Sequence, residues 1–183
     1  MCGNGKQKQN VRNNRRTLTI IVNCRDLDYS SYVGKKRVLC VDYGEKRIGL
    51  AISDINWRIA SPLRYLDNRG VYPSLFCVIE KQDIGVVIVG APIALNGGNS
   101  GKQFEKIKTF TERFSELSAT GTFDIKILYW DERLSTVAAN KILTEAKMTI
   151  ANKRKNIDKV AASFILQGFL DYVEHYLKLN RNV

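Results

Sequence analysis

The run Val38–Asp54 constrains the fold of this chain more than any other segment, because it places a carboxylate in an otherwise apolar strand. Asp42 ends the first apolar stretch, Gly44 and Gly49 permit a tight turn, and a second apolar stretch follows at 48–52. This pattern predicts a β-hairpin. A buried carboxylate without a partner is costly, so Asp42 is expected to face a cation or the open edge of a site. These residues alone leave open an ordinary hairpin in which Asp42 is a satisfied turn residue.

Further acidic residues stand where other predicted elements begin or end. A strand is predicted at 123–130, and Asp131 and Glu132 follow it directly. Successive strand residues point to opposite faces, so one of these two acids can share the face of Asp42. Asp158 is expected to open a helix, where capping of the helix N-terminus is its alternative role. Acids from two strand ends and one helix start predict a metal site.

Such a sparse set of carboxylates suits a hard divalent cation. Mg²⁺ retains several waters and binds few carboxylates together with substrate phosphate oxygens. Two such ions about 4 Å apart can activate a water and stabilise the leaving oxygen of a phosphodiester. A serine or cysteine hydrolase would lack a base here, because His175 is the only histidine and lies near the end of a predicted helix.

Four motifs occur in an order that is specific to one known family. They are Val41–Gly44 with Lys46–Gly49, then Val89–Gly90 with Pro92 and Asn96–Gly97, then Asp131–Thr136, and finally Asp158–Lys159 with Ala161–Ala162 and Ile165–Gln167. With these motifs, the chain resembles the YqgF/RuvX family from about Arg37 to Tyr172. Two residues depart from the family pattern. Ala91 stands where a larger apolar residue is more usual, and Trp130 precedes the acidic pair.

The resemblance implies a ribonuclease-H-like α/β fold of three layers, with a mixed central sheet of about five strands flanked by helices. It implies a nuclease, described for the family both as processing pre-16S rRNA in ribosome biogenesis and as a Holliday junction resolvase. By position, Asp42, Glu132 and Asp158 would be the catalytic residues and would hold Mg²⁺ or Mn²⁺. The strand alternation alone does not decide whether Asp131 or Glu132 is the ligand.

RNA processing at the 5′ end of pre-16S rRNA is the favoured expectation, since a monomer suffices for it. A resolvase acting on four-way DNA needs two sites in a symmetric dimer, so monomer and homodimer both stay open. A catalytically silent nucleic-acid-binding module of the same fold is a third alternative. An actin-like ATPase also begins with an Asp-x-Gly hairpin, but such ATPases have two related lobes and 183 residues hold only one.

The composition favours a polyanionic partner, here precursor rRNA or branched DNA. The chain has 29 Lys and Arg against 18 Asp and Glu, for a formal net charge of +11. Contacts of Lys and Arg with phosphates supply most nonspecific affinity for nucleic acids. The residues expected to bind nucleic acid are Lys46, Arg47, Arg133, Lys153, Arg154 and Lys155. The basic stretch at 147–156 could instead be only a solvated loop.

Residues 1–36 are expected to be a basic, disordered extension that is excluded from the fold. A targeting segment, a nucleic-acid-binding arm or residues added by a mis-assigned start codon are the alternatives. The apolar run Thr17–Val22 is too short to span a bilayer, so no membrane association is expected. The four cysteines show no metal-binding spacing. Cys40 and Cys77 are expected to be small buried residues, which suits a reducing, cytoplasmic compartment.

Residues 37–179 are expected to form one nuclease domain. Apolar periodicity predicts its strands at 37–43, 47–53, 63–66, 85–90 and 123–130, and its helices at 72–82, 102–117, 136–146 and 158–177. The aromatic stripe of the helix at 102–117 is expected to belong to the core and not to stack bases.

Overall fold

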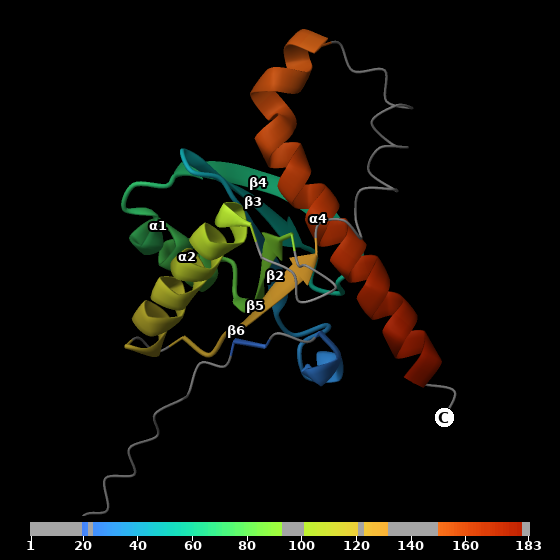
Figure 1. Cartoon of the computed structure of the whole chain (residues 1–183). Coiled ribbons are helices and arrows are strands. Elements are labelled where there is room, and N and C mark those ends of the chain that lie inside the picture. The colour runs from blue at the N-terminus through green and yellow to red at the C-terminus, as the bar shows by residue number, and fades with distance from the viewer. Residues whose placement is uncertain (1–19, 22–23, 93–100, 121–122, 132–149, 181–183) are drawn as a thin grey trace, which may run out of the picture.

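The computed structural model describes residues 20–21, 24–92, 101–120, 123–131 and 150–180. A single sheet of six strands runs through them, with helices on both of its faces (Figure 1). The strands are β1 (Ile20–Ile21), β2 (Arg37–Tyr43), β3 (Arg47–Ser53), β4 (Ala60–Asp67), β5 (Ile84–Ala91) and β6 (Lys126–Asp131). Their order across the sheet is β1-β6-β5-β2-β3-β4.

The sheet is mixed, as predicted. Strands β2, β3 and β4 form an antiparallel meander, whereas β5 is parallel to β2 and β6 is parallel to β5. The bounds of the β2–β3 hairpin match the prediction, and β4 is the edge strand but is longer than expected. Every residue of β5 is buried, because this apolar strand lies inside the sheet and is covered on both faces. This arrangement confirms the ribonuclease-H-like α/β fold.

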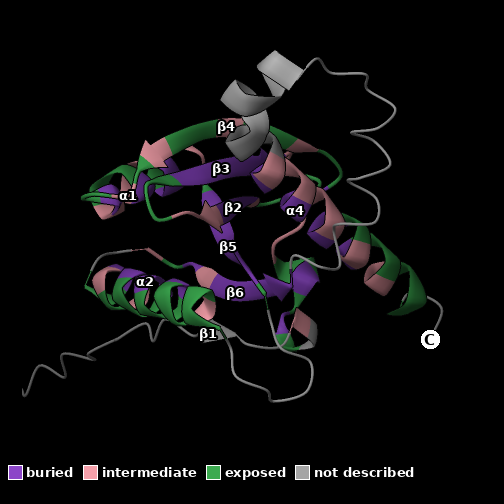
Figure 2. Ribbon diagram, turned by 45° about the horizontal axis from the view of Figure 1, so that its top comes forward, coloured by how far each residue is buried: buried purple, intermediate pink, exposed green. Residues whose placement is uncertain are grey.

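Helices cover the two faces of the sheet unequally. Helices α1 (Val71–Lys81) and α2 (Lys102–Ala119) lie together on one face, and α4 (Ile150–Asn180) crosses the other (Figures 1 and 2). The aromatic stripe of α2 is core, as predicted, since Phe110 and Phe114 are buried under the sheet. The helix predicted at 136–146 lies outside the described residues.

Helix α4 begins at Ile150, so the prediction that Asp158 opens this helix was wrong. Residues 150–157 contain no Gly or Pro, and Ala, Lys and Arg among them favour helix, so nothing local stops the helix from starting earlier. Asp158 lies about two turns inside α4 and does not cap it. The basic stretch that ends at Asn156 is accordingly helical from Ile150 onward and not a loop.

The prediction that residues 1–36 are disordered was wrong for the second half of this segment. The two-residue strand β1 pairs in parallel with β6 and extends the sheet. Two 3-10 turns follow, η1 (Cys24–Asp26) and η2 (Tyr29–Ser31), and they pack beside the C-terminal part of α4. The basic composition of this segment favoured disorder. Two of its apolar side chains, Leu27 and Tyr29, are nevertheless buried in the core between η2, the sheet and α4. Residues 1–19 lie outside the described residues.

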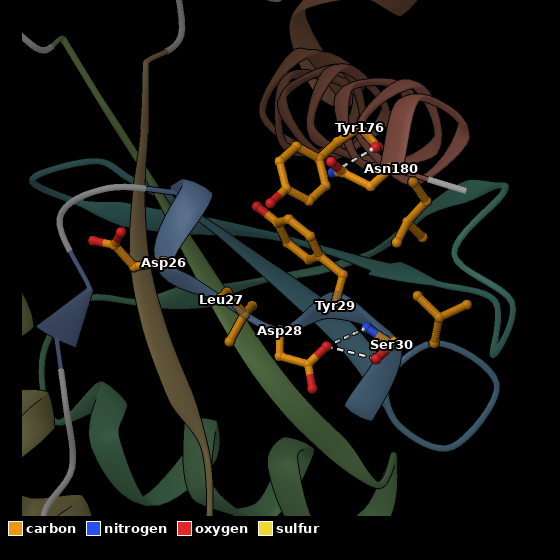
Figure 3. A pocket seen from close by; sticks show the side chains of 9 residues that line it. Asp26, Leu27, Asp28, Tyr29, Ser30, Tyr176 and Asn180 are labelled. Carbon is orange, nitrogen blue, oxygen red and sulfur yellow. Dashed lines mark hydrogen bonds between the residues drawn. The ribbon is translucent and has the colours of Figure 1, made fainter. Parts of the chain in front are cut away.

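Tyr29 is the anchor of this segment and is only 1% exposed. Its ring makes edge contacts with Trp57, Phe169 and Tyr176, at centroid distances of 6.2, 6.1 and 5.5 Å. Its hydroxyl donates a hydrogen bond to the carbonyl oxygen of Cys24, and burial raises the pKa of the phenol. Figure 3 shows the ring beside Tyr176 at the edge of a hollow of about 690 Å³. The segment is therefore part of the folded body.

The described helices include none with the length and apolar composition that crossing a bilayer requires.

Candidate active site

Asp42 lies near the C-terminal end of β2 and is half-buried. The alternation of β2 shows which face it occupies. Leu39 and Val41 belong to the core under α1 and α2, whereas Val38 and Cys40 belong to the core under α4. Since Asp42 follows Val41, its position is on the α4 face of the sheet.

Glycines flank Asp42 on both neighbouring strands. Gly49 of β3 lies directly opposite it in the antiparallel ladder. On the other side, Val41 is paired with Val89 of β5, so Gly90 follows beside Asp42. Neither glycine has a side chain that could cover the carboxylate. Both glycines are themselves buried, and a pocket of about 390 Å³ lies at Asp42. Its lining consists of Asp42, Tyr43, Gly44, Lys46, Arg47 and Gly49.

The β2–β3 turn brings Lys46 and Arg47 to this pocket. A Cβ atom on Gly44 would stand 2.4 Å from the backbone oxygen of Arg47, so the turn closes this tightly only with glycine. Asn68, which the sequence analysis did not single out, holds the turn from outside: its Nδ2 donates to the Gly44 carbonyl at 3.0 Å, and its backbone N–H donates to the Lys46 carbonyl at 3.1 Å. The pocket thus combines one carboxylate with two exposed cations.

Glu45 of the same turn is engaged elsewhere. It accepts a hydrogen bond from Lys106 of α2, and this bond with the charge of Lys106 lowers the pKa of the Glu45 carboxyl. Its charge is directed to α2, on the side of the sheet opposite α4. Asp42 is therefore the carboxylate that the hairpin presents to the pocket.

The structure separates Asp131 from Asp42. In β6, Leu128 and Trp130 belong to the core under α4, whereas Ile127 and Tyr129 belong to the core under α1 and α2. Asp131 therefore takes the face opposite to that of Asp42, and its side chain is buried. Glu132 and Arg133 lie outside the described residues.

Trp130 takes the strand position across Gly90 from Asp42. Its ring packs edge-on against Phe169 of α4 at 5.4 Å, so this departure from the family pattern helps to seat α4 on the sheet. Its buried indole Nε1 has no hydrogen-bond partner within the described ranges.

Helix α4 carries Asp158 to the same face of the sheet as Asp42. Position 158 lies four residues, about one turn, before Ala162, which is fully buried against the sheet. The side chains of Asp158, Lys153, Arg154 and Lys155 lie outside what the structure describes, although the helix itself is placed. Among the side chains that the structure describes, no three His, Cys, Asp or Glu residues form a group that could hold a metal ion. Of the three predicted ligands, Asp42 is the one whose side chain is described.

His175 is exposed and lies near the C-terminal end of α4, as predicted. Cys24, Cys40 and Cys77 form no disulfide among the described residues; Cys40 is buried as expected, whereas Cys77 is only half-buried.

Comparison with known proteins shows the family. The model of RuvX, described as Holliday junction resolvase, matches residues 36–172. A protein of Thermoanaerobacter pseudethanolicus named "Putative pre-16S rRNA nuclease" is 38% identical over 139 residues, which cover 74% of this chain and 96% of that protein. A protein of the same name from Paramagnetospirillum magneticum is 35% identical over 139 residues, covering 74% of this chain and 86% of its own.

Solved structures are more distant. The yeast mitochondrial Holliday junction resolvase Ydc2 aligns with a TM-score of 0.46 and 13% identity, over 80% of this chain and 84% of that one. The family match covers the region that contains Asp42, Glu132 and Asp158. The chain therefore belongs to the RuvX family of nucleases.

Proposed function

We propose that this protein is a metal-dependent nuclease that cleaves a phosphodiester bond in the 5′ region of precursor 16S rRNA during ribosome biogenesis. The observation that carries the proposal is the pocket at Asp42, which combines this carboxylate with the exposed cations Lys46 and Arg47. The cytoplasm is its proposed compartment, as the cysteine usage of the sequence suggests.

Asp42, Glu132 and Asp158 are proposed to hold Mg²⁺ or Mn²⁺. Carboxylate oxygens are the donors that these hard ions prefer, and the pocket beside Asp42 leaves room for an ion that keeps part of its water shell. Because Asp131 lies on the opposite face, Glu132 is the acid proposed from this end of β6, and α4 brings position 158 to the face of Asp42. When bound, the metal supplies an activated water and stabilises charge on the leaving oxygen.

The remaining residues bind and orient the substrate. Lys46 and Arg47 stand at the pocket rim, where they can attract the phosphates on either side of the scissile bond. Gly49 lines the pocket and has no side chain, which leaves room beside Asp42. Arg133, Lys153, Arg154 and Lys155 are proposed to extend this basic rim.

The names of the relatives favour the RNA substrate, and a single copy of the chain would suffice for its cleavage. The description of the family model favours a second candidate, cleavage of a four-way DNA junction, which requires two sites in a dimer.

A cleavage assay tests the function and separates the two substrates. The purified chain is incubated with a 5′-extended 16S rRNA fragment and, separately, with a four-way DNA junction, each with Mg²⁺, Mn²⁺ or chelator. We expect metal-dependent cleavage of the RNA. Cleavage of the junction alone would favour the second candidate. Binding of both substrates without cleavage of either would contradict the nuclease proposal and favour the silent binding module.

Joint replacement of Lys153, Arg154 and Lys155 by Ala is expected to weaken nucleic-acid binding across sequences. Each lost phosphate contact should lower the slope of log affinity against log salt by roughly one. The matched control replaces three exposed cations of α1 and α2, Lys81, Lys108 and Arg113, on the opposite side of the sheet. Fluorescence anisotropy at several salt concentrations checks this. An unchanged slope in the α4 variant, or an equal loss in the control, would place the binding surface elsewhere.

A further inference from the structure

An exposed aromatic side chain stands in the same row of the sheet as Asp42. Asp42 lies opposite Gly49, and Gly49 lies opposite Tyr65 of β4. Directly opposite residues of antiparallel strands share a face, so Asp42 and Tyr65 lie on one face with a glycine between them. Two strand spacings of about 4.8 Å put these positions roughly 10 Å apart.

Tyr65 is exposed to an unusual degree for a large aromatic residue, at 45%. The other large apolar side chains that the described part of the chain exposes are Ile59 and Leu179. Ile59 precedes β4 at the far end from Asp67, and Leu179 is near the end of α4, so neither shares the row of Asp42. β4 is the edge of the sheet, and most of its residues are open to solvent (Figure 2).

Arg47 joins Tyr65 to the pocket. Its guanidinium lies over the Tyr65 ring, 4.9 Å from the ring centre, and the same residue lines the pocket of Asp42. A cation that can contact a phosphate is thus in contact with an aromatic face two strands away from the carboxylate. Proteins that bind single-stranded nucleic acids combine these two elements, a basic track for the backbone and aromatic rings on which unpaired bases stack.

We propose that Tyr65, with Arg47 against its ring, is a stacking site for an unpaired base close to the scissile phosphate. The inference rests on the proposed function, because it takes the Asp42 pocket as the place of cleavage, and it adds that the strand bound there is single-stranded. Bases inside a duplex are stacked on each other and are not available to a ring on the protein surface. The site therefore selects single-stranded segments over duplex.

The test measures binding without cleavage. Anisotropy in chelator compares the parent chain with Tyr65→Ala, Tyr65→Phe and the control Ile59→Ala, which removes an exposed apolar side chain outside the row. The probes are a single-stranded oligoribonucleotide, a strand of the same length with abasic positions, and a duplex. Loss of one stacked base is expected to weaken single-strand binding by Tyr65→Ala about 10-fold or more. Tyr65→Phe and Ile59→Ala should bind like the parent.

The abasic strand and the duplex decide the interpretation. Stacking predicts that Tyr65→Ala changes binding of neither probe, because neither offers an unpaired base at that site. An equal loss on the abasic strand, or no loss on the normal strand, would overturn the stacking site. The proposed function fails separately: a parent chain that cleaves no substrate with metal, yet shows the Tyr65 effect, keeps the stacking site and loses the nuclease.

Discussion

Asp42→Asn is expected to reduce metal-dependent cleavage by at least about a thousand-fold while the protein stays folded. The change keeps the shape of the side chain but removes the negative charge that a divalent cation requires. Stabilisation of transition-state charge by such a cation amounts to several kcal/mol, and about 4 kcal/mol corresponds to a thousand-fold in rate. Single-turnover cleavage of the RNA fragment measures the effect, and circular dichroism checks the fold.

Asp131→Asn is the matched control for this prediction. Asp131 is also a carboxylate at the end of a strand, but it lies on the opposite face of the sheet from Asp42. Its replacement should reduce cleavage far less than Asp42→Asn or Glu132→Gln. Full activity in Asp42→Asn would remove the proposed metal site. A larger loss in Asp131→Asn than in Glu132→Gln would show that the ligand set had been taken from the wrong face of β6.

Tyr29→Ala is expected to lower the free energy of unfolding by about 3–5 kcal/mol, the usual cost of truncating a large buried aromatic residue. The ring fills the space between Trp57 and two aromatic residues of α4, Phe169 and Tyr176. Tyr29→Phe keeps the ring and loses only the hydroxyl bond to the Cys24 carbonyl, so it should cost about 1 kcal/mol. Urea denaturation of the three proteins checks both values.

The same prediction tests whether the segment before the family domain belongs to the fold. The family match begins at residue 36, and Tyr29 precedes it. If the free energy of unfolding of Tyr29→Ala lies within 1 kcal/mol of that of the parent, residues 24–36 are dispensable for stability. The expected loss would instead mean that this segment supports α4, the helix that carries Asp158.

The parts of the fold that could be predicted are those for which the pattern of residues close together in the sequence is sufficient. The bounds of β2 and β3 follow from two apolar stretches on either side of a glycine turn, and β5 follows from an uninterrupted apolar run. Asp42 could be singled out for the same reason, because a carboxylate in such a strand requires an explanation.

Features that depend on register or on distant packing could not be predicted. The start of α4 was misplaced because Asp is a common residue at helix N-termini, which pointed to Asp158. The helix-forming residues before Asp158 are uninterrupted, and the helix therefore begins at Ile150. Tyr29 was missed because two of its ring partners, Phe169 and Tyr176, are in α4, more than a hundred residues away. The row from Asp42 through Gly49 to Tyr65 requires the strand pairings, and an isolated tyrosine in β4 gives no sign of them.

The central claim is that Asp42 holds a divalent metal together with Glu132 and Asp158, and anomalous diffraction from crystals grown with Mn²⁺ tests it most directly. Mn²⁺ replaces Mg²⁺ at oxygen sites and gives a signal that locates the ion. The account predicts a peak within bonding distance of the Asp42 carboxylate and of Glu132 and Asp158, and its loss in Asp42→Asn. A Mn²⁺ peak bound elsewhere in a chain that still cleaves RNA, or cleavage that persists in chelator, would contradict the account.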